Sequence, residues 1–308
     1  MTRATGYLLV ATATTLWGLN APVSKVVLEH GFDTGQLTQV RVTGAFLVLA
    51  AILLATRPHT LRASPRQMVY LILFGLLGLN AVQLLYFLAI RELPVGVALL
   101  VEYIAPVLVA LYARFFRGER SGPWLWAAIA LVLLGLALMV EAFSGSLTLS
   151  GIGLTYAFMS AIAYAVYILM TEQIIHERPP VATICWGFGV AAVFWALARP
   201  WWEFPWSDLG AGVDLGGRMD AFSLPLGALV VYVVLAGTLI PFALLVSALH
   251  ALPASRVSLL STWEPVAGGL IAWMWLGESL STGQAAGAIL VLCGILVAES
   301  ATSLQIPH

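Results

Sequence analysis

The sequence predicts an all-α integral membrane protein with ten transmembrane helices, arranged as two inverted five-helix repeats with both termini in the cytoplasm. Three observations support this fold class: an apolar composition, a series of long apolar runs, and a second half that repeats motifs of the first. Of the 308 residues, 61% are hydrophobic and 9% are charged, and the mean hydropathy is +0.96. So few charged residues cannot cover a water-soluble protein of this length, so lipid must cover most of the surface.

Ten apolar runs are long enough to be transmembrane helices, which need roughly 20 mostly apolar residues each. The first run contains Trp17, Asn20 and Pro22 and lacks a small-x-small cleavage site, which favours a retained helix over a signal peptide. The predicted spans are residues 5–28, 36–56, 68–90, 94–116, 122–141, 150–172, 181–198, 225–248, 252–276 and 281–299.

The basic residues predict the orientation, because Lys and Arg in short loops stay mainly on the cytoplasmic side. With both termini inside, nine of the 14 Lys and Arg residues lie on that side. The outer side then holds the longest predicted loop, residues 199–224. Its Trp201, Trp202 and Trp206 are typical of a membrane interface. The predicted location is therefore the cell membrane, that is, the plasma or inner membrane, as a multi-pass protein.

The second half of the chain repeats the first. Leu93-Pro94 recurs as Leu252-Pro253, Pro106 recurs as Pro265, and Gly118-Glu119 recurs as Gly277-Glu278, all at an offset of about 159 residues. A weaker match aligns Trp17 with Tyr164 at an offset of about 147. We therefore divide the chain into repeats at residues 1–145 and 146–308. Five spans per repeat is an odd number, so the second repeat must be inverted in the membrane, which is typical of carriers.

Two carboxylates are expected inside the membrane, where an ionisable side chain is a site candidate because its burial is costly. Glu102, followed by Tyr103, lies near the middle of the fourth span, and Pro106 removes the backbone donor for its carbonyl. Glu102 either binds an amine or carries a proton, or it is neutral and hydrogen-bonded to a neighbouring helix; the sequence leaves both open. Glu264 lies between Trp263 and Pro265, and either has a functional role or marks a kink.

Arg41, just inside the second span, could bind a carboxylate through its guanidinium group. The sequence favours a different interpretation, in which the side chain extends towards the interface or pairs with Asp33 or Glu29. Lys25 is expected to be an interfacial anchor.

Uncharged polar and aromatic side chains are candidates for the wall of a central cavity. Trp17 and Asn20 share a face of the first span, and Asn80 and Gln83 share a face of the third. Tyr164 and Tyr167 share a face of the sixth span. Any one of them is more often a packing or interhelical contact than a ligand group. The prolines expected to break helices or to act in gating are Pro22, Pro106, Pro241 and Pro265.

Several function classes lack their sequence signatures. There is no P-loop, no His-Glu-x-x-His and no Gly-x-Ser-x-Gly motif, so we predict that the protein is not an enzyme and needs no cofactor. The two cysteines have no spacing partner for a metal, and the five histidines lie near span ends or in loops, so no metal site is predicted. A net charge of −1 gives no basic surface for nucleic acid.

The sequence resembles the EamA branch of the drug/metabolite transporter superfamily over essentially its whole length, and within it the bacterial homoserine/threonine exporters and, more distantly, the aromatic amino-acid exporters. One departure is Tyr164, where the repeat usually carries tryptophan, so the resemblance does not define this part of the cavity wall. The motifs that carry the resemblance are Trp17-Gly18-Leu-Asn20, Arg41, Leu93-Pro94, Pro106, Gly118-Glu119, Leu252-Pro253, Glu264-Pro265, Gly277-Glu278 and Gly283-Gln284.

The predicted function is secondary transport of a small metabolite by alternating access. The resemblance implies a central cavity and export of amino acids or related metabolites, with threonine and homoserine as the leading substrates. The expected partners are this substrate, the lipid bilayer and protons as a candidate coupling ion, in a monomer or weak homo-oligomer without nucleic acid. The alternatives are a carrier of another compound, such as a vitamin, nucleoside or hydrophobic cation, and a membrane protein without transport activity.

Overall fold

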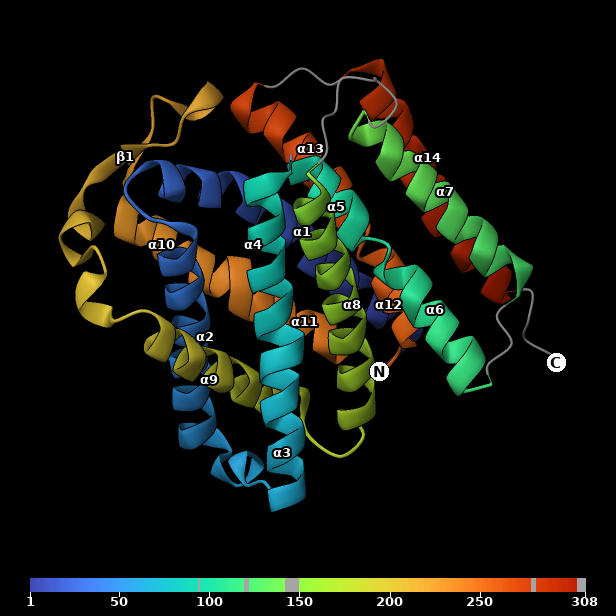
Figure 1. Ribbon diagram of the computed structural model, residues 1–308, viewed down its shortest axis with the longest axis horizontal. Coiled ribbons are helices and arrows are strands. Elements are labelled where there is room, and N and C mark those ends of the chain that lie inside the picture. The colour runs from blue at the N-terminus through green and yellow to red at the C-terminus, as the bar shows by residue number, and fades with distance from the viewer. Residues whose placement is uncertain (94, 119–121, 142–149, 278–280, 304–308) are drawn as a thin grey trace.

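The protein is built almost entirely of helices. The computed structural model describes residues 1–308 except 94, 119–121, 142–149, 278–280 and 304–308 (Figure 1). The α-helices are α1 (Arg3–Glu29), α2 (Thr34–Thr56), α3 (Pro65–Leu73), α4 (Ala81–Glu92), α5 (Val95–Glu102), α6 (Ala105–Phe116), α7 (Pro123–Met139), α8 (Gly151–Ile174), α9 (Pro180–Ala198), α10 (Leu226–Val234), α11 (Ile240–Ala248), α12 (Ala254–Leu260), α13 (Trp263–Leu276) and α14 (Thr282–Ser303).

All ten predicted spans are occupied by helix within the described residues. Two apolar helices, Pro123–Met139 and Thr282–Val297, are shorter than the usual length of a membrane-spanning helix. The loop motif residues Pro94, Glu119 and Glu278 lie outside the described residues. Six segments are long and apolar enough to cross a membrane: Thr34–Thr56, Pro65–Ala89, Val97–Phe116, Gly151–Ile174, Pro180–Ala198 and Leu226–Ala248.

Two of the predicted spans are interrupted helices. The fourth is divided into α5 and α6 by a turn at residues 103–104, and the ninth into α12 and α13 by a turn at residues 261–262. Pro106 and Pro265 lie in the first turns of α6 and α13, where the N–H that proline lacks would have no helical partner. Both prolines therefore lie directly after a turn that interrupts a predicted span.

The other two prolines behave differently. Pro22 lies inside α1, which continues from Arg3 to Glu29, so the predicted break there is wrong. Proline is tolerated in a membrane helix when neighbouring groups stabilise the backbone around it, and Pro22 is buried. Pro241 opens α11 directly after the π-helix η6 (Leu235–Leu239). A second π-helix, η2 (Phe74–Asn80), joins α3 to α4, so both of these segments change helical pitch without breaking.

Helices α7 and α14 pack side by side at one flank of the molecule (Figure 1). Glycines bring their backbones together: a Cβ added at Gly135 would lie 2.6 Å from the Gly287 carbonyl oxygen, and one at Gly287 would lie 2.4 Å from the Gly135 oxygen. Small residues allow this approach where lipid gives no hydrophobic driving force between helices. Elsewhere α2 packs on α9, α4 on α8, and α1 on both α11 and α13.

The segment from residue 199 to 225, which was expected to be a plain loop, is a small folded unit. It contains three 3₁₀ turns, η3 (Trp201–Glu203), η4 (Trp206–Gly210) and η5 (Gly217–Met219), and an antiparallel hairpin of β1 (Gly212–Asp214) and β2 (Ser223–Pro225). We call it the hairpin cap. The Gln36 amide donates to the Glu203 carbonyl at 3.0 Å and the Trp275 indole to the Leu215 carbonyl at 3.0 Å, so the cap joins α2 to α13.

An ion pair joins the N-terminus of α2 to the hairpin cap. Asp33 caps α2 and forms an ion pair with Arg199. Burial raises the pKa of the Asp33 carboxyl, but the hydrogen bonds from Arg199 and from the N–H groups of Gln36 and Gly35 outweigh it and hold the pKa below its usual value. Asp33 therefore already has a cationic partner at the end of the helix.

We predict that Gly287→Ala destabilises the protein, by about 1–3 kcal/mol, because its Cβ would press against the backbone of α7. Gly283→Ala, one turn earlier on α14, is the control, since its nearest outside neighbours are at 3.6 Å and 4.0 Å. Thermal unfolding in detergent measures both. Equal melting temperatures for the two variants would contradict the tight contact between α7 and α14.

Candidate functional site

Polar groups gather where the two interrupted helices meet. Tyr103 lies in the turn between α5 and α6, and its hydroxyl donates to Glu264 Oε2 at 2.8 Å. Glu264 lies in the first turn of α13. One hydrogen bond therefore joins the two interruptions, which lie about 160 residues apart in the sequence.

Glu102 is the last residue of α5 and faces α8. Ser160 lies within hydrogen-bond distance of Glu102 Oε2 at 2.8 Å and of the Val82 carbonyl oxygen at 3.1 Å. The hydroxyl carries one proton, so it donates to one of these oxygens at a time. The bond to a neighbouring helix expected for Glu102 is thus present. Glu102 as a whole residue is partly buried, and its carboxylate faces the buried hydroxyl group of Ser160.

Arg41 does not extend to the interface as expected. Its side chain is 9% exposed, and its Nε donates to Thr238 Oγ1 at 2.9 Å, while Nη2 lies 3.4 Å from the Gly237 carbonyl oxygen. Asp33 cannot be its partner because Arg199 occupies that carboxylate. Among the described residues, no carboxylate lies within salt-bridge distance of Arg41. A buried guanidinium group therefore bonds only neutral acceptors, next to the π-helix η6.

Six side chains influence one another electrostatically. Arg41 interacts with Glu264 and Tyr86, and Glu264 interacts with Glu102 and Tyr164. Ser261, in the turn before α13, also influences Tyr164. We call the following set the central polar cluster: Arg41, Tyr86, Glu102, Tyr103, Tyr164 and Glu264.

Tyr86 is the one member of the cluster that the sequence did not single out. It lies three residues after Gln83 and six after Asn80, on the face of the third span that those two already marked. Helical spacing alone could have identified it.

The two carboxylates of the cluster lie at opposite ends of helical dipoles. Glu102 is at the C-terminal end of α5, where the carbonyl groups of the last turn disfavour a negative charge. Glu264 is in the first turn of α13, where free N–H groups favour one, and Arg41 adds a positive charge nearby. The fold therefore places the two acids in opposite electrostatic environments.

Several predicted cavity residues carry buried polar atoms that have no hydrogen-bond partner among the described residues. Asn20 is 8% exposed, Asn80 4% and Gln83 8%, and Asn20 Oδ1, Asn80 Oδ1 and both amide atoms of Gln83 have no partner. Buried polar groups are normally hydrogen-bonded, so such atoms are where a ligand or water is expected. Asn20 is packed tightly, because a Cβ on Gly237 would lie 2.0 Å from its Oδ1.

The aromatic candidates have mostly packing roles. Trp17 meets Phe242 edge-on with ring centroids 5.0 Å apart, and Tyr167 stacks on Phe74 at 5.6 Å. The Trp263 indole donates to Thr15 Oγ1 at 2.9 Å and so joins α13 to α1. Of the aromatic residues predicted for the site, Tyr103 and Tyr164 are the ones brought into the central polar cluster.

A cavity of about 1010 Å³ lies away from this cluster, at one end of the helical bundle. Its lining comes from α3, α6, the C-terminal end of α8 and the connection between α11 and α12, and it contains none of the predicted site residues. Within the described residues, no group of three or more His, Cys, Asp or Glu side chains is placed to hold a metal ion.

Comparison with known proteins decides the family. The profile of the EamA-like transporter family matches residues 4–141 and 151–299. The chain belongs to this family. The transporter is 30% identical to the threonine/homoserine exporter RhtA of Salmonella typhimurium over 271 residues, covering 88% of this chain and 82% of that protein.

Two further similarities extend over nearly the whole chain. The transporter is 24% identical to the uncharacterized inner membrane transporter YicL of Salmonella typhimurium, covering 95% of this chain and 94% of YicL. A solved crystal structure with 22% sequence identity matches with a TM-score of 0.80, covering 99% of this chain and 100% of that chain, which shows a shared fold. The protein is thus a multi-pass transporter of the cell membrane with a small-molecule substrate.

We predict that Gly237→Ala destabilises the transporter through a clash with Asn20, and that Asn20→Ala largely relieves the clash in the double variant. A double-mutant cycle of thermal unfolding should give a coupling free energy of roughly 1–3 kcal/mol between the two positions. Additive effects would show that α1 and η6 are not in close contact.

Proposed function

We propose that the transporter exports a small zwitterionic amino acid, such as threonine or homoserine, by alternating access between two inverted five-helix repeats. The observation that carries this proposal is the buried guanidinium group of Arg41, which lies in the same electrostatic cluster as Glu102 and Glu264. Among the residues that the structure describes, no carboxylate lies within salt-bridge distance of it. A zwitterion supplies both charges that such a cluster can bind.

The repeat organisation, residues 1–145 and 146–308 with cytoplasmic termini, is supported by equivalent features at equivalent places. The helix interruptions at 103–104 and 261–262 follow the sequence offset of about 159 residues, and the π-helices η2 and η6 lie at a similar offset. Helices at equivalent positions in the two repeats pack against each other. The second spans, α2 and α9, are in contact, and so are the fifth spans, α7 and α14. The family profile also matches the chain in two stretches.

The charged members of the cluster and several residues beside it have proposed roles. Arg41 binds the substrate carboxylate, because guanidinium groups hold carboxylates through paired hydrogen bonds. Glu102 binds the substrate ammonium group or carries a proton, since it lies in the same cluster as Arg41 and its helix end disfavours a permanent charge. Glu264 and Pro265 form a bent gate element, which the hydrogen bond from Tyr103 to Glu264 holds in place. Asn20 and Trp17 form part of the wall.

The similarity to an exporter named for threonine and homoserine supports a neutral, polar substrate of this size. Protons are the proposed coupling ion because a carboxylate at membrane depth can cycle between neutral and charged forms. No covalent chemistry is required of the protein.

We predict that proteoliposomes loaded with unlabelled threonine or homoserine accumulate the labelled amino acid by counterflow, and that a proton gradient changes the rate. Glu102→Gln should remove the pH dependence, because an amide cannot carry the proton. Absence of flux with these amino acids and with phenylalanine would refute the proposed substrate class. Unchanged flux and pH profile in a folded Glu102→Gln protein would refute the role of Glu102.

We predict that Arg41→Met lowers transport at least about tenfold while leaving the melting temperature unchanged or higher. Burial of a charge that lacks an ionic partner costs free energy, and an apolar side chain of similar length removes this cost. Arg57→Met, at the exposed end of α2, is the control and should change neither property. Transport at the wild-type rate in Arg41→Met would exclude a carboxylate-binding role.

A further inference from the structure

Helix α8 passes from the central polar cluster to the cavity. Ser160 and Tyr164 contact the cluster, Tyr167 and Ile168 are buried, and Glu172 lines the cavity. Twelve residues of α-helix separate Ser160 from Glu172, which corresponds to about 18 Å. The cluster and the cavity are therefore two separate compartments along one helix.

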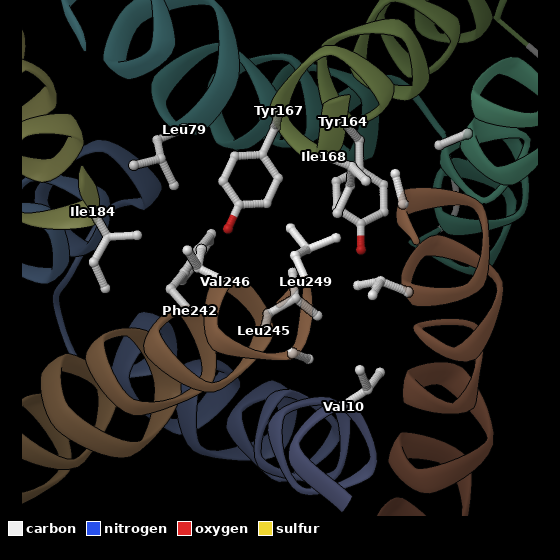
Figure 2. Close-up of a cluster of buried hydrophobic side chains, with 14 of the residues drawn as sticks. Val10, Leu79, Tyr164, Tyr167, Ile168, Ile184, Phe242, Leu245, Val246 and Leu249 are labelled. Carbon is white, nitrogen blue, oxygen red and sulfur yellow. The ribbon is translucent and has the colours of Figure 1, made fainter. Parts of the chain in front are cut away.

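A layer of buried side chains lies between these compartments. Figure 2 shows Tyr167 and Ile168 of α8 facing side chains of α11 and α1. Their exposure is 1% for Tyr167 and 0% for Ile168, Leu245, Val246 and Val10. We call these five residues the hydrophobic layer. Side chains buried to this degree are closely packed, so the layer separates the cluster from the cavity.

Glu172 joins three helix ends on the cavity side of this layer. One carboxylate oxygen forms an ion pair with Arg117 just after α6, and the other accepts the backbone N–H of Ala254, the first residue of α12, at 2.7 Å. Arg117, Glu172 and the neighbouring Pro253 all line the cavity. Glu172 and Arg117 are partly buried, with side chains 13% and 26% exposed, so water screens the pair only in part.

Glu172 joins α8 to α6 and α12. Each of these two helices is the half of an interrupted segment that leads away from the central polar cluster. On the cluster side, Tyr103 and Glu264 join the same two segments. The segments are therefore fastened to each other on one side of the layer and to α8 on the other. The two bonds of Glu172 hold α6 and α12 against α8 beside the cavity.

We propose that Glu172 is the latch that holds the hydrophobic layer closed on the cavity side, and that breaking its bonds to Arg117 and Ala254 opens the cavity to the central cluster. The cavity is then the vestibule from which substrate approaches. This inference rests on the proposed alternating-access function.

The first repeat has no carboxylate at the position equivalent to Glu172. The offset of about 147 residues pairs Glu172 with Lys25, an exposed residue of opposite charge. Two repeats with equal gates would open to either side at similar free energy, whereas a carboxylate present at one gate biases the equilibrium. Glu172 therefore stabilises the state in which the route to the cavity is closed.

The test measures access to the layer directly. Val246→Cys, in a background with Cys185→Ala and Cys293→Ala, places one thiol in the layer. Its rate of reaction with a hydrophilic maleimide is measured in detergent, where no membrane orientation has to be assumed. We expect Glu172→Gln to raise this rate severalfold, because the amide can still accept from Ala254 but loses the ion pair. Glu172→Ala should raise it further.

The matched control is Glu177→Gln, which removes the same charge from an exposed residue lining the same cavity and should leave the rate unchanged. Equal rates for the Glu172 and Glu177 variants would overturn the latch. If Glu172→Gln does not give a monodisperse protein, Glu172→Asp replaces it, since its shorter side chain cannot reach both partners and should also raise the rate. Labelling needs no substrate, so a raised rate supports the latch even if the flux experiments fail.

Discussion

Inside a bilayer no water is available to satisfy a polar group, so every interruption of a helix must find its partners within the protein. The turns at residues 103–104 and 261–262 are two such interruptions, and the hydrogen bond from Tyr103 to Glu264 joins them. The central polar cluster follows from this constraint, because side chains that stabilise one broken helix lie next to those of the other. Arg41 belongs to the same cluster, and its guanidinium group donates a hydrogen bond to Thr238 in the π-helix η6.

The cluster combines a buried cation with two acids whose surroundings differ. Glu264 has a helix N-terminus, Tyr103 and the field of Arg41 to stabilise a negative charge. Glu102 has a helix C-terminus and a shared hydroxyl group. The two acids therefore differ in the helix end that they occupy and in their hydrogen-bond partners. That difference is a consequence of where the helices break.

The closed hydrophobic layer and the bonds of Glu172 concern a different part of the transport cycle. Dispersion and burial make the layer compact, but apolar packing by itself favours no particular state of the carrier, since the layer can separate and repack. Charge-assisted bonds at the cavity end have a fixed direction and two fixed partners. The bonds of Glu172 can therefore determine which side of the protein is closed, while the hydrophobic layer determines how closely the side chains pack in the closed state.

The sequence by itself determined which segments are helical, because a bilayer demands long apolar runs, and it located the breaks at Pro106 and Pro265, because proline lacks the backbone donor a helix requires. The tertiary structure alone decided the partners of the charged side chains. Arg41 was expected at the interface, and only the fold shows that Thr238, 197 residues away, accepts its hydrogen bond. The folded hairpin cap and the pairing of Glu172 with Arg117 were also invisible, since apolar periodicity carries no information about which helices become neighbours.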